Sequence, residues 1–126
     1  MASANLERNK QIALELFRAL THREAEKLDR LMADDLEWWI LGNLGLSGLK
    51  TKETFKQAVQ LLWDLYGGCR DHQHGVHHTE DDRVALIGKG DMVTKDGKPY
   101  RNDYNVLLVI RNGQIVKGRK FSILNW

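Results

Sequence analysis

The chain has 126 residues and a formal net charge of +2, with 42% hydrophobic and 29% charged residues, which predicts one globular domain, residues 1–126, with its own hydrophobic core. Basic residues are interspersed with acidic ones and no apolar run reaches the roughly 18 residues of a membrane span, so neither nucleic acid nor a membrane is an expected partner. The N-terminus lacks the apolar core of a signal peptide and the single cysteine, Cys69, allows no intramolecular disulfide, which together predict a cytoplasmic protein.

Two helices are predicted at the start of the chain, where apolar residues recur three and four positions apart. The first runs to about Leu20, and Ser3 is placed to cap it. The sequence Thr21-His22-Arg23-Glu24 has the Thr-x-x-Glu form of a capping box and predicts the start of a second, short helix.

A strand, a loop and a third helix are predicted next. Aromatic and branched residues favour a strand at about Leu36–Leu41, and the glycines that follow it indicate a loop ending at Gly48. Thr51 is expected to cap a third helix that runs from Lys52 to about Tyr66.

Beyond residue 70 the hydrophobic period changes to two, which predicts four consecutive strands. Because Val106–Ile110 is apolar on both faces, the sheet is expected to be covered on both sides. Helices followed by strands indicate an α+β fold, with three N-terminal helices packed on a curved mixed or antiparallel sheet. The expected strand ranges are about His72–Glu80, Arg83–Thr94, Tyr100–Arg111 and Gln114–Ile123, the last two joined by a tight turn at Asn112-Gly113.

Lys89 and Asp91 are the clearest indication of chemistry. They lie two residues apart in a predicted strand, among apolar neighbours, and therefore project from the same face of the sheet. Ionisable groups against an apolar wall are costly unless they are paired, and such groups gather in functional clefts.

Short segments spread over nearly the whole chain carry a family resemblance. They are Ala33-Asp34-Asp35-Leu36-Glu37-Trp38-Trp39, Gly48 before the third helix, Glu80-Asp81-Asp82-Arg83-Val84-Ala85, Tyr100-Arg101-Asn102-Asp103-Tyr104 and Asn112-Gly113-Gln114-Ile115. In this order the elements resemble the NTF2-like superfamily, and within it the SnoaL-like and ketosteroid-isomerase-like branch, with limonene-epoxide hydrolase as a relative. The resemblance implies a cone-shaped fold whose mouth holds a small hydrophobic ligand without a cofactor. It also implies a homodimer packed through the outer face of the sheet.

The catalytic residues of these relatives are only partly matched. The Arg-x-Asp pair of the epoxide hydrolases corresponds to Lys89-Gly90-Asp91, and their second acid falls on Lys120. Their water-holding Tyr and Asn fall on Trp38 and Ile40; the base of ketosteroid isomerase also falls on Ile40, and its oxyanion-hole Tyr falls near Phe17. The resemblance therefore implies the family's fold with altered chemistry.

The candidate catalytic residues are Asp91, Lys89 and Lys120. Asp91 is expected to act as general acid/base with Lys89 as its electrostatic partner. Burial would lower the pKa of a lysine that lacks a partner, which would make it a base or an amine nucleophile. The alternative is that Asp91 only forms an ion pair with Lys89 or Lys120 inside the cone. The expected substrate-binding residues, several placed by the family's strand phase, are Trp38, Ile40, Trp63, Val93, Asn102, Tyr104 and Ser122.

Two functions remain open from the sequence. The first is a small cofactor-independent enzyme that acts on a hydrophobic molecule as an isomerase, a cyclase or an epoxide-hydrolase-like catalyst. The second is a non-catalytic domain of the same fold that binds a small molecule or associates with a partner. No metal site is expected, because His72, His74, His77 and His78 are not completed by Cys or carboxylate ligands at a recognisable spacing.

Overall fold

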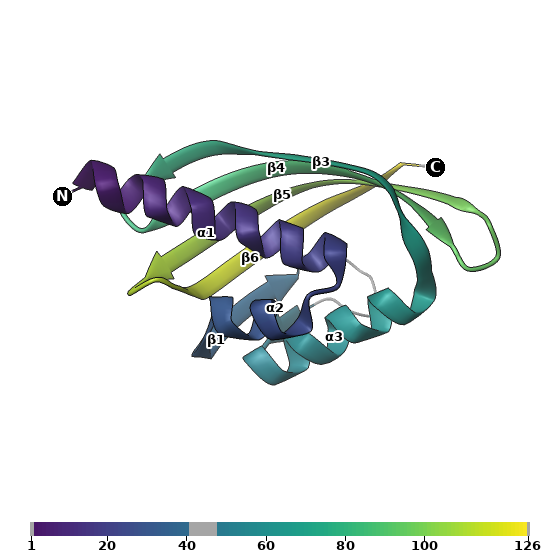
Figure 1. Ribbon diagram of the computed structural model, residues 1–126, viewed down its shortest axis with the longest axis horizontal. Coiled ribbons are helices and arrows are strands. Elements are labelled where there is room, and N and C mark those ends of the chain that lie inside the picture. Colours follow the sequence, from purple (N-terminus) through teal and green to yellow (C-terminus); the bar gives the residue numbers. More distant parts are fainter. Residues whose placement is uncertain (1, 41–47, 126) are drawn as a thin grey trace.

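The computed structural model describes the backbone of residues 2–40 and 48–125, and side chains within these ranges except at 2–4, 65–74, 76–77, 91–92, 100–104 and 121–125. Three helices and a six-stranded sheet form the fold (Figure 1). The prediction of an α+β fold with N-terminal helices and a mixed sheet is confirmed. The predicted loop before Gly48 lies outside the described residues.

The first two helices are α1 (Ala2–His22) and α2 (Ala25–Leu31). The predicted capping box is wrong, because Thr21 and His22 belong to the last turn of α1, and Glu24, the N-cap residue of α2, makes no side-chain capping hydrogen bond. Arg23 adopts a left-handed φ of 58°, and the Glu24 N–H donates to the Ala19 carbonyl at 2.9 Å, as in a Schellman C-cap. Ser3, the predicted cap of the first helix, lies inside α1.

The third helix, α3 (Lys52–Leu65), begins as predicted, directly after Thr51. The Thr51 hydroxyl accepts a hydrogen bond from the Thr54 N–H at 3.2 Å, and the Thr51 N–H donates to the Thr54 hydroxyl at 2.8 Å. This reciprocal pair satisfies backbone donors that the first helical turn would otherwise leave free.

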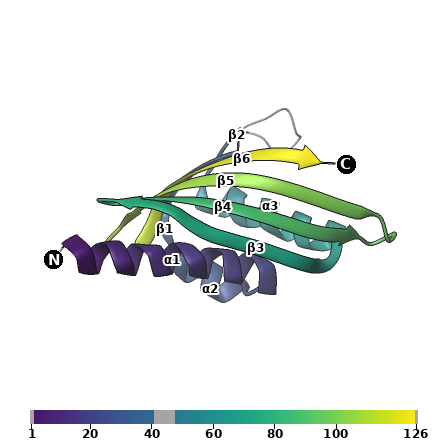
Figure 2. The ribbon, with the colours of Figure 1, turned by 90° about the horizontal axis from the view of Figure 1, so that it is seen from above.

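The sheet has the order β2-β1-β6-β5-β4-β3. The β1 and β6 strands pair in parallel, and the remaining neighbours pair antiparallel. The turn at Asn112-Gly113 has φ values of 53° and 78°, as expected for a tight hairpin. Figure 2 shows the strands curving along their length. Their bounds are β1 (Met32–Ile40), β2 (Gly48–Lys50), β3 (Tyr66–Glu80), β4 (Arg83–Thr94), β5 (Pro99–Arg111) and β6 (Gln114–Asn125).

The hydrophobic core lies between the helices and one face of the sheet, here called the inner face. The α1 helix contacts β3 and β4, and α3 contacts β1 and β3 (Figure 1). Strand alternation sends every second side chain into this core. The inner-face core residues on the last three strands are Val84, Leu86, Val106, Leu108, Ile110 and Ile115.

The opposite face of the sheet, here called the outer face, is not covered by the described residues of this chain. Four large apolar side chains on it, Leu49, Trp39, Leu107 and Ile87, remain between 40% and 58% exposed. Trp39 is paired with Leu49 and with Arg119, and Arg119 is paired with Leu107. Leu49, Trp39 and Leu107 therefore lie in one row across the sheet, with Arg119 between Trp39 and Leu107. We call the four apolar residues the outer apolar patch. The expectation of a sheet covered on both sides is wrong for the single chain.

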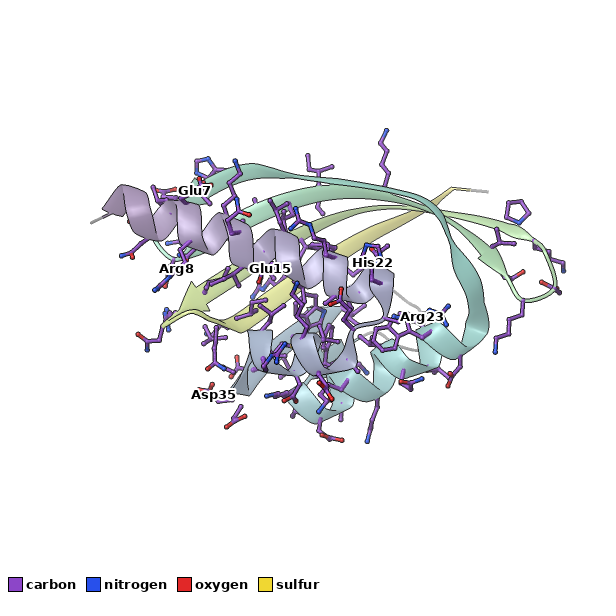
Figure 3. All side chains as sticks on the ribbon, in the orientation of Figure 1. Glu7, Arg8, Glu15, His22, Arg23 and Asp35 are labelled. Carbon is purple, nitrogen blue, oxygen red and sulfur yellow. The ribbon has the colours of Figure 1, made fainter. Side chains whose placement is uncertain are left out.

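Among the described residues no helix combines the length and the apolar character needed to cross a bilayer. Charged side chains such as Glu7 and Arg8 on α1 and Asp35 on β1 are exposed to solvent (Figure 3).

Candidate functional site

Lys120 lies on the inner face of β6, among apolar residues of the neighbouring strands. Its register partner on β5 is Val106, which is 2% exposed, and its partner on β1 is Ile40, which packs against the core. Register partners project from the same face of a sheet. The lysine stem is therefore flanked on both sides by hydrocarbon.

The surroundings of Lys120 disfavour its charged form. Its side chain keeps part of its surface exposed although most of its surroundings are protein. Burial lowers the pKa of Lys120 below the ordinary lysine value, because an ammonium group loses hydration there. The Lys120 amine therefore gives up its proton more readily than a lysine in water does.

Two further rows of register positions continue the sheet beyond Lys120. The backbone register aligns Ser122, Tyr104 and Gly88 in the first row. It aligns Asn102 with Gly90 in the second. Both glycines are buried, and they add no side chain to this part of the inner face. The side chains of Asn102, Tyr104 and Ser122, three expected binding residues, lie outside the described residues.

Trp38 shares its inner-face row with Gly118, on the opposite side of Lys120 from the two rows just described. It is 2% exposed. Its indole lies over Gly118 of β6 and against the Phe55 ring of α3, with ring centroids 4.5 Å apart. The buried indole Nε1–H has no hydrogen-bond partner among the described residues. The residue is a core group in this structure, and the absence of a side chain at position 118 makes room for it.

The expected inward orientation of Lys89 is wrong. Lys89 is exposed on the outer face, while its neighbours Gly88 and Gly90 occupy the buried inner positions. The β4–β5 register has no bulge that would change this alternation, so Asp91 and Val93 occupy the same alternate positions as Lys89. Val93 is partly exposed, and the side chain of Asp91 lies outside the described residues. The core-facing phase of β4 is set by Val84 and Leu86, which puts the glycines inside.

Trp63, another expected ligand contact, joins two helices. Its indole Nε1–H donates to the carbonyl of Leu20 at the end of α1, at 3.0 Å, and its ring packs against the core. Its polar atom is therefore already used in holding α3 to α1.

The histidines on β3 are only partly described. The register pairs His72 with Gly90 and His74 with Gly88, but the side chains of His72, His74 and His77 lie outside the described residues. His78 is exposed, and its Nε2 lies 3.4 Å from the Glu80 carboxylate. Within the described part of the chain no three His, Cys, Asp or Glu side chains are grouped as metal ligands.

A hollow of about 390 Å³ on the surface between α2 and α3 is lined by charged residues. Lys52 lies 3.3 Å from Asp34 and 3.5 Å from Asp29, and it donates to the Met32 carbonyl at 3.1 Å. Lys56 lies 2.8 Å from Asp29, and this hydrogen bond lowers the pKa of the Asp29 carboxyl. Both lysines of this cluster are engaged by carboxylates of α2 and β1, so we assign the cluster to holding α3 on α2 and β1.

Comparison with known proteins identifies the family. The profile of the SnoaL-like domain family matches residues 13–118. None of the curated proteins matches the chain. Among solved structures, a proposed isomerase from Bacillus subtilis superimposes with a TM-score of 0.82 at 14% identity, covering 94% of this chain and 88% of that one. An NTF2-like protein from Anabaena variabilis gives 0.81 at 19% identity, over 99% and 94%.

A proposed polyketide cyclase from Streptomyces antibioticus, IdmH, gives a TM-score of 0.74 at 17% identity, over 90% of this chain and 91% of that one. At these identities the solved structures establish the fold alone. The family profile covers most of the chain, and the element order agrees with it. The chain therefore belongs to the SnoaL-like domain family, within the NTF2-like fold.

Proposed function

We propose that this protein is a cofactor-independent enzyme that moves a proton on a hydrophobic small molecule bound against the inner face of the sheet, as an isomerase or a cyclase does. The observation that carries the proposal is the position of Lys120 between Val106 and Ile40. Two similar folds belong to a proposed isomerase and a proposed polyketide cyclase, and general acid–base catalysis is one way in which such reactions are accelerated.

Lys120 acts as the proton acceptor in this proposal. A base is most effective when its pKa lies near the working pH, and burial moves the pKa of Lys120 downward, in that direction. Ile40, which is only partly buried, offers apolar surface beside Lys120 for the hydrocarbon body of the substrate. Tyr104 and Asn102 occupy the next alternate register positions of β5.

Lys89 and Asp91 are left out of this mechanism. An epoxide-hydrolase-like reaction through that pair needs both groups beside the ligand, whereas Lys89 is exposed on the outer face. Lys89 therefore serves as a control lysine in the experiments below.

The test is hydrogen–deuterium exchange at carbon. Cyclic ketones are incubated with the protein in deuterium oxide, and loss of their α-proton signals is followed by NMR. We expect the wild type and Lys89→Ala to accelerate exchange, and Lys120→Met to lose the acceleration. Equal exchange by wild type and Lys120→Met would reject Lys120 as the base.

The alternative is a non-catalytic ligand-binding domain, which the buried, apolar surroundings of Lys120 also favour. The same NMR experiment separates the two functions. A binding protein broadens or shifts the ketone signals without accelerating exchange above the buffer rate.

We also propose a homodimer packed through the outer apolar patch. Single exposed apolar residues are ordinary on a protein surface, whereas a row of them on an uncovered sheet indicates an interface. A second copy of the chain would cover Trp39, Leu49, Leu107 and Ile87 and complete the two-sided burial that the apolar β5 sequence suggests.

A further inference from the structure

We propose that the substrate is an aldehyde or ketone with an apolar body, and that the Lys120 amine captures its carbonyl carbon as an imine. The inference rests on the proposed function in one respect, namely that the ligand reaches the inner face beside Lys120. It adds a covalent role and a substrate class to that site.

The position of Lys120 carries this proposal. Its stem lies between the side chains of Val106 and Ile40, so an apolar substrate body and the amine share one stretch of the inner face. Lys120 is only partly buried by relative exposed area, unlike its fully buried register partner Val106. The neighbouring row contains Gly88, and the row after it Gly90, neither of which adds a side chain there.

A lysine amine can attack a carbonyl carbon only in its neutral, unprotonated form. At an ordinary lysine pKa of about 10.4, on the order of one amine in 2,500 is neutral at pH 7. Burial lowers the pKa of Lys120 and so enlarges the neutral fraction there. Desolvated lysines activated in this way are the ones that form Schiff bases.

The proposed step balances without a cofactor. The Nζ lone pair adds to the carbonyl carbon and gives a carbinolamine, and loss of one water molecule leaves a carbon–nitrogen double bond in place of the carbon–oxygen double bond. Protonation of the imine nitrogen by solvent draws electrons from the substrate and makes its α-hydrogens more acidic. In this route Lys120 activates the substrate instead of acting as the base, and a water molecule accepts the α-proton.

The experiment is borohydride trapping followed by peptide mass mapping. The protein is incubated at neutral pH with benzaldehyde or with a cyclic ketone, and borohydride then reduces any imine to a stable secondary amine. The modified lysine gains the mass of the carbonyl compound less one oxygen atom. We expect this adduct at Lys120 and not at Lys117, which lies exposed on the same strand.

Variants supply the matched controls. Lys120→Arg keeps the positive charge but cannot form an imine, so the adduct should be lost completely, whereas Lys117→Arg should retain it. If Lys120→Arg does not fold, the ratio of Lys120 to Lys117 labelling in the wild type still decides the question. No adduct at all, or equal labelling of both lysines, would overturn the proposal.

The outcome also separates this inference from the proposed function. Accelerated α-proton exchange without an adduct supports the base role and overturns the imine. An adduct at Lys120 without exchange or turnover supports the imine and rejects the enzymatic proposal.

Discussion

Gly118→Ala would place a methyl group inside the space occupied by the Trp38 indole. A Cβ built at this position lies 2.2 Å from Cε3, 2.3 Å from Cζ3 and 2.9 Å from Cδ2 of the tryptophan. Carbon atoms in favourable contact are about 3.5–4.0 Å apart, so the ring would have to move by more than about 1 Å.

The ring has little freedom to move. Trp38 is 2% exposed, and its indole already rests on Phe55 of α3. Forcing an extra methyl group into a packed core costs about 1–3 kcal/mol. For a domain of this length that cost lowers the melting temperature by roughly 3–15 °C.

Urea unfolding monitored by circular dichroism measures the change in the free energy of unfolding caused by Gly118→Ala, and Gly75→Ala is the matched control. Gly75 is also a strand glycine, but it is exposed and nothing lies within 4 Å of a Cβ built on it. We expect a neutral or slightly stabilising effect at Gly75, because alanine restricts the unfolded chain more than glycine does.

A double-mutant cycle with Trp38→Phe tests whether contact with the Trp38 indole causes the loss of stability in Gly118→Ala. A single phenyl ring does not fill the positions of Cε3 and Cζ3, so Gly118→Ala should cost little when Phe occupies position 38. The expected coupling is about 1–3 kcal/mol. Equal effects of the alanine at positions 118 and 75, or no coupling to Trp38, would refute this reasoning.

Three further predictions concern the dimer, the lysine and the helix cap. Leu107→Lys should give a monomer in sedimentation velocity, while Leu61→Lys, on the equally exposed surface of α3, should stay dimeric; a dimer in both would reject the interface. Burial lowers the pKa of Lys120 in the folded state. Between this lowered pKa and about 10.4, the unfolded chain binds more protons at Lys120 than the folded chain does, so the stability of the wild type rises with pH across this window. Lys120→Met should therefore be more stable than wild type at neutral pH and lose this advantage towards about pH 10, and an advantage independent of pH would contradict the burial argument. Thr51→Ala removes the acceptor for the Thr54 N–H and should cost about 1 kcal/mol in urea unfolding, whereas an unchanged midpoint would show that the cap is not needed.

Most of the elements follow from local sequence, but β1 and β3 begin earlier than expected, at Met32 and Tyr66, and the short strand β2 was not expected. The polar and glycine residues at Asn112-Gly113 fix a hairpin turn, and Thr51 caps α3 through atoms only three residues away. The capping box expected at Thr21 is an exception. Its motif is compatible with a helix start, but Arg23 adopts a left-handed conformation and the preceding helix continues to His22.

The site depends on the phase of β4, which the sequence leaves open. Val84 and Leu86 on one face and Ala85 and Ile87 on the other are all apolar, so alternation alone does not indicate which face meets the helices. The prediction that Lys89 faces inward is therefore wrong. The sequence signal for the buried face was the pair Gly88 and Gly90, which alternate in phase with Val84 and Leu86 and are buried like them.

The sequence by itself determined the three helices, five of the six strands and their order along the chain, because hydrophobic period, capping residues and turn residues act over a few positions of the chain. Only the tertiary structure decided which face of β4 is buried and that Lys120 lies between Ile40 and Val106. The pKa of Lys120 depends on its surroundings, which Ile40 and Val106 help to form from distant parts of the chain. Solvation is set by what surrounds a group in space, and a linear pattern does not specify it.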